Sequence, residues 1–270
     1  MSQINKLKIF NDPIYGFITI PNELIYDLIQ HSYFQRLRRI SQMGLSYLVY
    51  PGANHTRFHH ALGCMHIMQK AVQTLQFKGV SISEEEENAL YIAILLHDIG
   101  HGPYSHAMEH SIVEEVHHEE LSLLFMEQLN KEFDGKLALA IQVFKGEYHR
   151  KFMLQLISSQ LDMDRMDYLK RDSFYSGVAE GNINSERLIQ MMNVQDDYLV
   201  IEEKGIYLTG GLTNLKGLPT YIRERVGLPV TTVDEPELCA VKGLQKIILD
   251  KEYYKKLTYS MLDEDYRWLR

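Results

Sequence analysis

Apolar residues recur at helical spacing along most of this chain, in long stretches that turn-forming residues separate. The separating positions are glycines and proline-glycine pairs, at Gly44, Pro51-Gly52, Gly79, Gly102-Pro103, Gly135 and Gly177. The helical pattern continues to Tyr198, so it predicts a mainly α fold for this part of the chain. Residues 197–203 (Asp-Tyr-Leu-Val-Ile-Glu-Glu) read as a short strand.

The pattern changes after Gly205. A strand, a Gly-Gly turn, a helix, a second strand and a second helix are expected to follow one another there. Alternation of this kind is typical of α/β structure. We therefore expect a mainly α helical bundle with a short C-terminal α/β appendage.

One predicted helix places two polar residues in an apolar environment. The helix begins at Ser83, where Glu86 completes a capping box, and the run Leu90–Leu96 should be buried. Gly100 and Gly102-Pro103 are expected to end it. The pair His97-Asp98 therefore falls on the last turn of a buried helix, where an unpaired aspartate would be costly.

A metal ion would remove that cost. One histidine of the stretch Arg57–Gly63, the His97-Asp98 pair and the distant Asp164 can together surround a divalent cation. Imidazole and carboxylate ligands suit Mn, Fe, Ni, Co or Zn, and carboxylates also admit Mg. Such a cation generates a hydroxide nucleophile near neutral pH, as phosphoryl hydrolysis requires. The alternative is that His97-Asp98 is a chance dipeptide.

Other polar residues lie near these candidates. His101 and His106 follow the pair, and singly each could belong to a surface loop. Asp164, Tyr168 and Asp172 are spaced four residues apart, so they share one helix face, which Arg165 flanks. A solvated charged face is the alternative for that stripe.

Composition limits the possible functions. The 270 residues (31.5 kDa) carry a net charge of -8, which indicates no basic nucleic-acid-binding surface. Two cysteines, Cys64 and Cys239, are too few for a disulfide framework and fit a reducing cytoplasm. No signal peptide and no 18-residue apolar run are recognised, so we expect a soluble, cytoplasmic protein without a membrane span. All twelve histidines lie between His31 and His149.

Residues 7–204 resemble the HD-domain phosphohydrolases, and within them the deoxynucleoside triphosphate triphosphohydrolases. The matching stretches occur in the family's order, and they are Asp12–Gly16, Phe34–Gly44, Tyr50–His60, Leu95–His106, His118-Glu119 and Leu161–Asp172. Several long motifs in one order make a more specific signal than a His-Asp dipeptide. The resemblance implies a homo-oligomer that acts on a nucleotide substrate.

The resemblance also implies roles for individual residues. The last histidine of the Arg-Phe-x-His motif is the family's ligand, so His60 and not His59 is expected to bind the metal. The implied ligands of one divalent metal ion are His60, His97, Asp98 and Asp164. Positions near the nucleoside or the phosphates are Gln42, Met43, Arg57, Arg165 and Tyr168, and Asp172 meets the ribose 3′-hydroxyl. His101 and His118 match histidines near the scissile phosphate, while His106 and Glu109 match supporting or acid–base positions.

Residues 205–270 resemble a different family, the C-terminal end of the bacterial actin-like MreB proteins. The matching stretches are Gly205–Leu218, Val226–Val230, Asp234–Glu237, Val241–Leu244 and Asp263–Arg270. The alternative is an ordinary α/β tail of the HD protein. However, the helices that normally complete the HD nucleotide pocket are not recognised, and neither are the earlier phosphate loops of an actin-like protein.

We therefore predict two domains, a truncated HD domain over 1–204 and an actin-like fragment over 205–270. The favoured function is metal-dependent hydrolysis of deoxynucleoside triphosphates, or of related nucleotides, with attack at the α-phosphorus and release of deoxynucleoside and tripolyphosphate. Truncation could impair this activity. The alternatives are an actin-like filament fragment and a catalytically inactive HD module that binds nucleotide.

Overall fold

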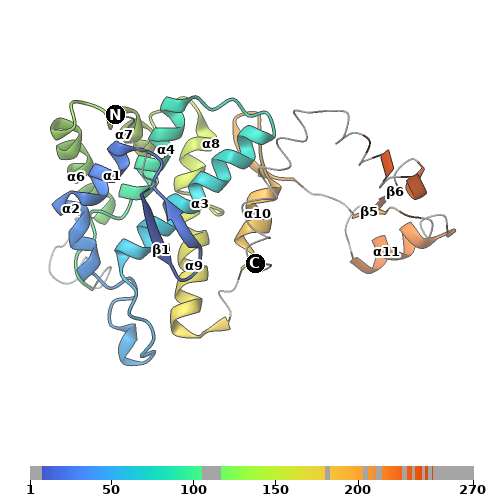
Figure 1. Cartoon of the computed structure of the whole chain (residues 1–270), viewed down its shortest axis with the longest axis horizontal. Coiled ribbons are helices and arrows are strands. Elements are labelled where there is room, and N and C mark those ends of the chain that lie inside the picture. Colours follow the sequence, from blue (N-terminus) through green and yellow to red (C-terminus); the bar gives the residue numbers. More distant parts are fainter. Residues whose placement is uncertain are drawn as a thin grey trace, which may run out of the picture. The chain divides into compact units, whose positions relative to one another are not determined.

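The structure is a computed structural model, and it describes residues 8–104, 117–179 and 183–202 together with short segments between 206 and 245. The chain divides into two compact units, residues 1–202 and 203–270. Most helices belong to the first unit and the strand–helix–strand segment to the second (Figure 1). The prediction of a mainly α fold with a short α/β appendage is confirmed. The domain boundary at 204–205 remains a prediction.

The first unit is built from helices. The helices before residue 105 are α1 (Glu23–Gln30), α2 (Ser32–Gln35), α3 (Arg57–Phe77) and α4 (Glu84–Leu96), with short 3-10 turns at η1 (Arg36–Arg39) and η2 (Ser46–Leu48). The helices after residue 116 are α6 (His118–Glu132), α7 (Ala138–Lys145), α8 (Lys151–Ile157), α9 (Met163–Ser176) and α10 (Ser185–Met191). Helix α3 contacts both α4 and α9, and Figure 1 shows it in the middle of this unit.

Helix α4 begins as predicted, but it ends at Leu96, so Asp98 lies in the turn after the helix and not on its last turn. The Ser83 hydroxyl accepts a hydrogen bond from the Glu86 amide at 3.2 Å, and Glu86 accepts one from the Ser83 amide at 2.9 Å. This reciprocal pair is a capping box. The apolar run Leu90–Leu96 is buried, and His97 is the residue that ends the helix. The pair His97-Asp98 therefore emerges from the interior of the first unit.

Two hairpins in the first unit depart from the predicted helical pattern. Strands β1 (Ile9–Asp12) and β2 (Gly16–Thr19) pair antiparallel, as do β3 (Met192–Gln195) and β4 (Tyr198–Ile201). Strand β4 confirms the strand expected at 197–203, but its partner β3 lies where helix was expected. Asp196 and Asp197 join them with φ of 50° and 66°. Two left-handed residues give the tight turn whose twist matches a hairpin, and apolar periodicity does not report that turn.

The second unit contains the expected strand–helix–strand order. Strand β5 (Ile206–Leu208) pairs in parallel with β6 (Val230–Thr232), and helix α11 (Leu218–Val226) connects them. A short 3-10 turn, η5 (Pro236–Leu238), follows. Parallel strands require such a crossover connection. None of the described helices is both long and apolar enough to cross a membrane.

Candidate metal centre and its surroundings

Histidine 60 lies in the first turn of α3 and points into the protein, whereas its neighbour is used differently. His59 Nδ1 lies 3.3 Å from the Thr56 amide, which donates to it, and 3.0 Å from the Thr56 hydroxyl. His59 therefore caps the start of α3. His60 is fully buried, and its Nδ1 lies 2.8 Å from Asp167 Oδ2. Because consecutive helical residues point about 100° apart, only one of this histidine pair can face the interior.

The ring of His60 is held by a buried chain of charged groups. The Arg171 Nε and Nη2 donate to the two carboxylate oxygens of Asp167, at 2.8 and 2.9 Å. Arg171 Nη1 also donates to Asp12 Oδ2 at 2.8 Å. Burial by itself raises the pKa of Asp167, but Arg171 and His60 outweigh it and leave that pKa below its usual value. Asp167 is therefore a carboxylate that accepts the Nδ1 proton of His60, so in the neutral form of His60 the lone pair lies on Nε2.

Histidine 97 is oriented in the same way by a backbone group. Its Nδ1 lies 2.6 Å from the carbonyl oxygen of Ile94, which can only accept, so Nδ1 carries the proton. Its Nε2 is buried and has no hydrogen-bond partner among the described residues. That nitrogen lies 3.5 Å from both Asp98 Oδ1 and Asp164 Oδ1. In the neutral form of His97, the lone pair on Nε2 therefore points toward the carboxylates of Asp98 and Asp164.

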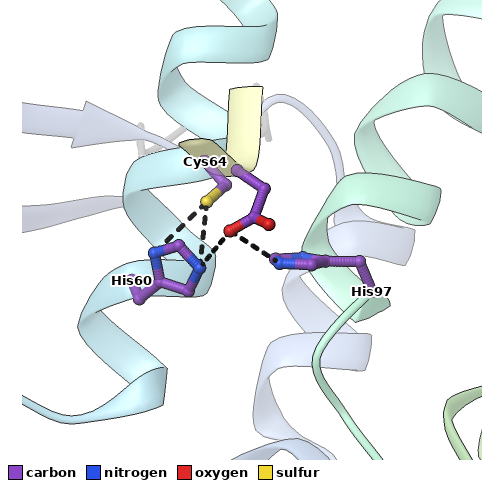
Figure 2. Close-up of side chains that lie close together, drawn as sticks. His60, Cys64 and His97 are labelled. Carbon is purple, nitrogen blue, oxygen red and sulfur yellow. Dashed lines mark hydrogen bonds and ion pairs between the residues drawn. The ribbon is translucent and has the colours of Figure 1, made fainter. Parts of the chain in front are cut away.

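The two carboxylates complete a cluster of four residues. Asp164 Oδ1 lies 2.9 Å from His60 Nε2, and Asp98 Oδ2 lies 3.7 Å from the same nitrogen. Asp98 Oδ2 is also paired with the buried Arg57. Figure 2 shows the His60 and His97 rings facing each other from different segments of the chain, and their centroids are 5.4 Å apart. The structure thus brings the ligand atoms of His60, His97 and Asp164 into one group, and it places Asp98, which belongs to an adjoining group with His101 and His118, beside both histidines.

The charges in this cluster favour a bound cation. Burial lowers the pKa of His60, but its contacts with Cys64, Asp164 and Asp167 outweigh burial and hold that pKa well above the usual value. Burial raises the pKa of Asp98, but His97, Arg57 and His101 hold it well below the usual value. Protons are thus drawn to the nitrogens between the carboxylates. A divalent cation can take the place of those protons, and the donor set of imidazole nitrogens and carboxylate oxygens suits such an ion.

Cysteine 64 is part of this cluster, and no role was predicted for it. Its Sγ lies 3.5 Å from Nδ1 and 3.6 Å from Nε2 of His60 (Figure 2). Together with His60, His97 and Asp164 it forms a group whose ligand atoms lie within 4.8 Å of one another. The signal in the sequence was its spacing of four residues from His60 on α3. Burial raises the pKa of the Cys64 thiol.

A second group of acid–base residues adjoins the first through Asp98. His101 Nε2 lies 3.3 Å from Asp98 Oδ1, and the rings of His101 and His118 stack with centroids 3.9 Å apart. Burial lowers the pKa of His101 to about 4. His118 is the first residue of α6, and Ser122 on the same helix donates to the His97 carbonyl at 2.7 Å. The predicted positions His106 and Glu109 lie outside the described residues.

The residues predicted to contact substrate lie on two segments beside this cluster. Gln42 and Met43 are half-buried in the turns that precede α3, and Arg57 is buried at its start. On α9, Tyr168 and Asp172 are half-buried one and two turns beyond Asp164, while Arg165 is exposed. The roles of these residues remain predictions.

Comparisons with known proteins agree with this site and with the two-part chain. Residues 57–172 match the family model of the HD domain, and residues 196–256 match that of the MreB/Mbl protein. A crystal structure of a phosphohydrolase from Bacteroides thetaiotaomicron is 54% identical, with a TM-score of 0.72, covering 82% of this chain and 53% of that one.

Two curated relatives extend the comparison. An uncharacterized protein of Bacillus subtilis, YwfO, is 38% identical over 76% of this chain and 48% of its own length. The deoxynucleoside triphosphate triphosphohydrolase SAMHD1 homolog of Dictyostelium discoideum is 33% identical over 74% of this chain and 42% of its own. The chain spans about half the length of the curated relatives that it matches.

The fold and the His-Asp cluster define an HD domain. The chain belongs to the HD-domain phosphohydrolases that are related to the SAMHD1 triphosphohydrolases, and it carries in addition a segment that matches MreB/Mbl.

Proposed function

We propose that the HD domain hydrolyses deoxynucleoside triphosphates at the α-phosphorus and releases deoxynucleoside and tripolyphosphate. The observation that carries the proposal is the orientation of His60 and His97. Each ring donates from Nδ1 to an outer acceptor and turns Nε2 toward the carboxylates of Asp98 and Asp164. We infer that these four residues hold one divalent cation, which when bound lowers the pKa of a water molecule to near neutrality.

The neighbouring residues support phosphate chemistry at this position. Arg57 lies against Asp98 at the edge of the cluster, where its guanidinium can neutralise a phosphate oxygen. Arg165 and Tyr168 project from the helix that carries Asp164, and they can orient the rest of the triphosphate. Asp172, a further turn along, can accept a hydrogen bond from a sugar hydroxyl.

Protonation of the leaving 5′-oxygen requires an acid close to the cluster. His101 and His118 are the candidates, because their stacked rings lie next to Asp98. With a pKa of about 4, His101 is neutral near pH 7 in the structure described. The negative charge of a bound triphosphate would raise that pKa, which would favour protonation of His101.

Metal analysis tests the site independently of turnover. The purified chain should contain one equivalent of a divalent metal by mass spectrometry of the acid-digested protein. Replacing His97-Asp98 by Ala-Ala should abolish metal retention. His59→Ala is the matched control, because His59 caps α3 beside the ligand His60 and should leave the metal content unchanged. Retention of metal by the His97-Asp98 variant would remove the basis of the site.

The identity of the products tests the reaction. We expect incubation with the four deoxynucleoside triphosphates and Mn²⁺ to yield deoxynucleoside and tripolyphosphate, distinguished by ³¹P NMR. Pyrophosphate with monophosphate, or orthophosphate with diphosphate, would contradict attack at the α-phosphorus even if the metal site is right. Because residues 196–256 match the MreB/Mbl family model and the helices that complete an HD nucleotide pocket are not recognised in the sequence, a nucleotide-binding module without turnover is the second candidate. It predicts saturable binding in calorimetry and no product.

A further inference from the structure

Histidine 55 is a buried titratable residue that the proposed chemistry does not use. It lies in the loop two residues before α3, and its side chain is 0% exposed. Its Nε2 lies 2.6 Å from Oδ1 of Asp172, 117 residues further along the chain on α9. A carboxylate accepts, so Nε2 is the donor in this hydrogen bond. Asp172 therefore shares a short, charge-assisted contact with a fully buried donor.

The ring of His55 is fixed by its packing. It stacks on Tyr175, with centroids 4.5 Å apart and 17° between the planes. The same loop approaches α9 closely at Gly52, where an added Cβ would lie 2.5 Å from the Tyr175 carbonyl oxygen. A side chain held by stacking and by a close backbone contact presents its N–H in one direction. Asp172 thus meets a preorganised donor.

The backbone of His55 fixes a second predicted substrate contact. The Gln42 amide donates to the His55 carbonyl oxygen at 3.0 Å, and Ser41 and Thr56 form an antiparallel bridge next to it. Gln42 and Asp172 come from segments that are far apart in sequence. His55 is the residue that contacts both, through its main chain and its side chain respectively.

We infer that His55 is a positioning residue that orients the Asp172 carboxylate toward the 3′-hydroxyl of a deoxyribose. The hydrogen bond from His55 occupies Oδ1, and it leaves Oδ2 without a hydrogen bond among the described residues. Because this hydrogen bond fixes Oδ1, the direction of Oδ2 is fixed as well. Oδ2 can therefore accept a hydrogen bond from the sugar hydroxyl without a prior rotation of the Asp172 side chain. This inference rests on the proposed function, because it assumes a deoxynucleotide beside α9.

Two substitutions separate the hydrogen bond from the packing. His55→Phe keeps an aromatic ring to stack on Tyr175 but removes the donor to Asp172. His55→Gln removes the stack but places an amide N–H near the position of Nε2. If His55 acts through the hydrogen bond, the glutamine variant should be closer to the unaltered protein in sugar recognition. If His55 only packs the loop against α9, the phenylalanine variant should be the closer one.

The readout is recognition of the 3′-hydroxyl. We would measure kcat/KM for the best of the four deoxynucleoside triphosphates and for its 2′,3′-dideoxy counterpart, and divide the first by the second. His55→Phe should lower this ratio about tenfold, the size expected for loss of one hydrogen bond to a charged group. Asp172→Asn should lower it at least as much, and His55→Gln should restore most of it.

The controls distinguish failure of this inference from failure of the proposed function. If the unaltered chain neither binds nor hydrolyses any deoxynucleoside triphosphate, the proposed function is wrong and the role of His55 falls with it. If the unaltered chain is active but does not discriminate the dideoxy substrate, only the inference is overturned. An unchanged ratio in His55→Phe, with a lower melting temperature, would show that His55 is a packing residue.

Discussion

The carboxylate of Asp167 should strengthen metal binding without touching the metal. It accepts the Nδ1 proton of His60 at 2.8 Å and both donors of the Arg171 fork at 2.8 and 2.9 Å. Asp167→Asn keeps an acceptor for His60 but removes the negative charge that makes its imidazole a stronger ligand. Losing such an outer partner typically weakens metal binding about 10- to 100-fold. We therefore expect the metal dissociation constant to rise by that factor.

The same substitution should also destabilise the fold, which calls for a matched control. Breaking a buried ion pair costs about 3–5 kcal/mol, and Asp167→Asn should lie near the lower limit because Arg171 keeps Asp12 at 2.8 Å. Asp12→Asn removes the other carboxylate from Arg171 and should cost about 1.5–3 kcal/mol. The asparagine keeps a side-chain oxygen that can accept hydrogen bonds from the backbone amides of Ile14 and Tyr15. In the unaltered protein these amides donate to Asp12 Oδ1 at 2.9 and 3.1 Å.

Competition with a chromogenic chelator would give the metal dissociation constants, and urea unfolding followed by circular dichroism would give the stabilities. Asp12→Asn should destabilise the protein and leave the metal dissociation constant within about twofold, because the contact between His60 and Asp167 is intact. If both variants weaken metal binding equally, the effect is one of general stability. If Asp167→Asn binds metal normally, the proposed support of His60 is refuted.

Gly63→Ala should destabilise the protein by about 3 kcal/mol or more in urea unfolding, because its Cβ would lie 2.0 Å from a carboxylate oxygen of the buried α9 ion pair. Gly102→Ala serves as the control, because its Cβ meets no atom of the described residues within 4 Å; equal losses would contradict this. Glu86→Gln should cost about 1–2 kcal/mol at neutral pH. Burial raises the pKa of Glu86, but hydrogen bonds from Ser83, Tyr148 and Arg150 outweigh it and lower that pKa. The stabilisation by the Glu86 carboxylate is therefore fully present above the usual glutamate pKa, and it is lost as the pH falls through the lowered pKa of Glu86. If the loss of stability in Glu86→Gln stayed constant down to pH 3, this role of the Glu86 carboxylate would be refuted. Limited proteolysis between the two units should release a stable N-terminal piece, whereas a single resistant core of the full 31.5 kDa would argue against two units.

The sequence alone determined the features whose causes are local. The capping box of α4 joins Ser83 to a residue three positions away, and the apolar run behind it buries the helix. Its C-terminal end therefore places His97-Asp98 in the interior, as predicted. The resemblance selected His60 among the histidines of Arg57–Gly63, because a long motif identifies a position that spacing alone cannot. The alternation after Gly205 likewise predicted the strand–helix–strand order, and the structure pairs the two strands in parallel.

Only the tertiary structure decided which partners those residues meet. The contact of His60 with Asp167 spans 107 residues, that of Arg171 with Asp12 spans 159, and that of His55 with Asp172 spans 117. No periodicity or motif spacing specifies such pairs, because they depend on how α3, α9 and the β1–β2 hairpin pack. The rotation of α3 about its axis likewise makes His59 a cap and buries His60 and Cys64. Residue types indicated the chemistry, but packing of distant segments determines which atoms face one another.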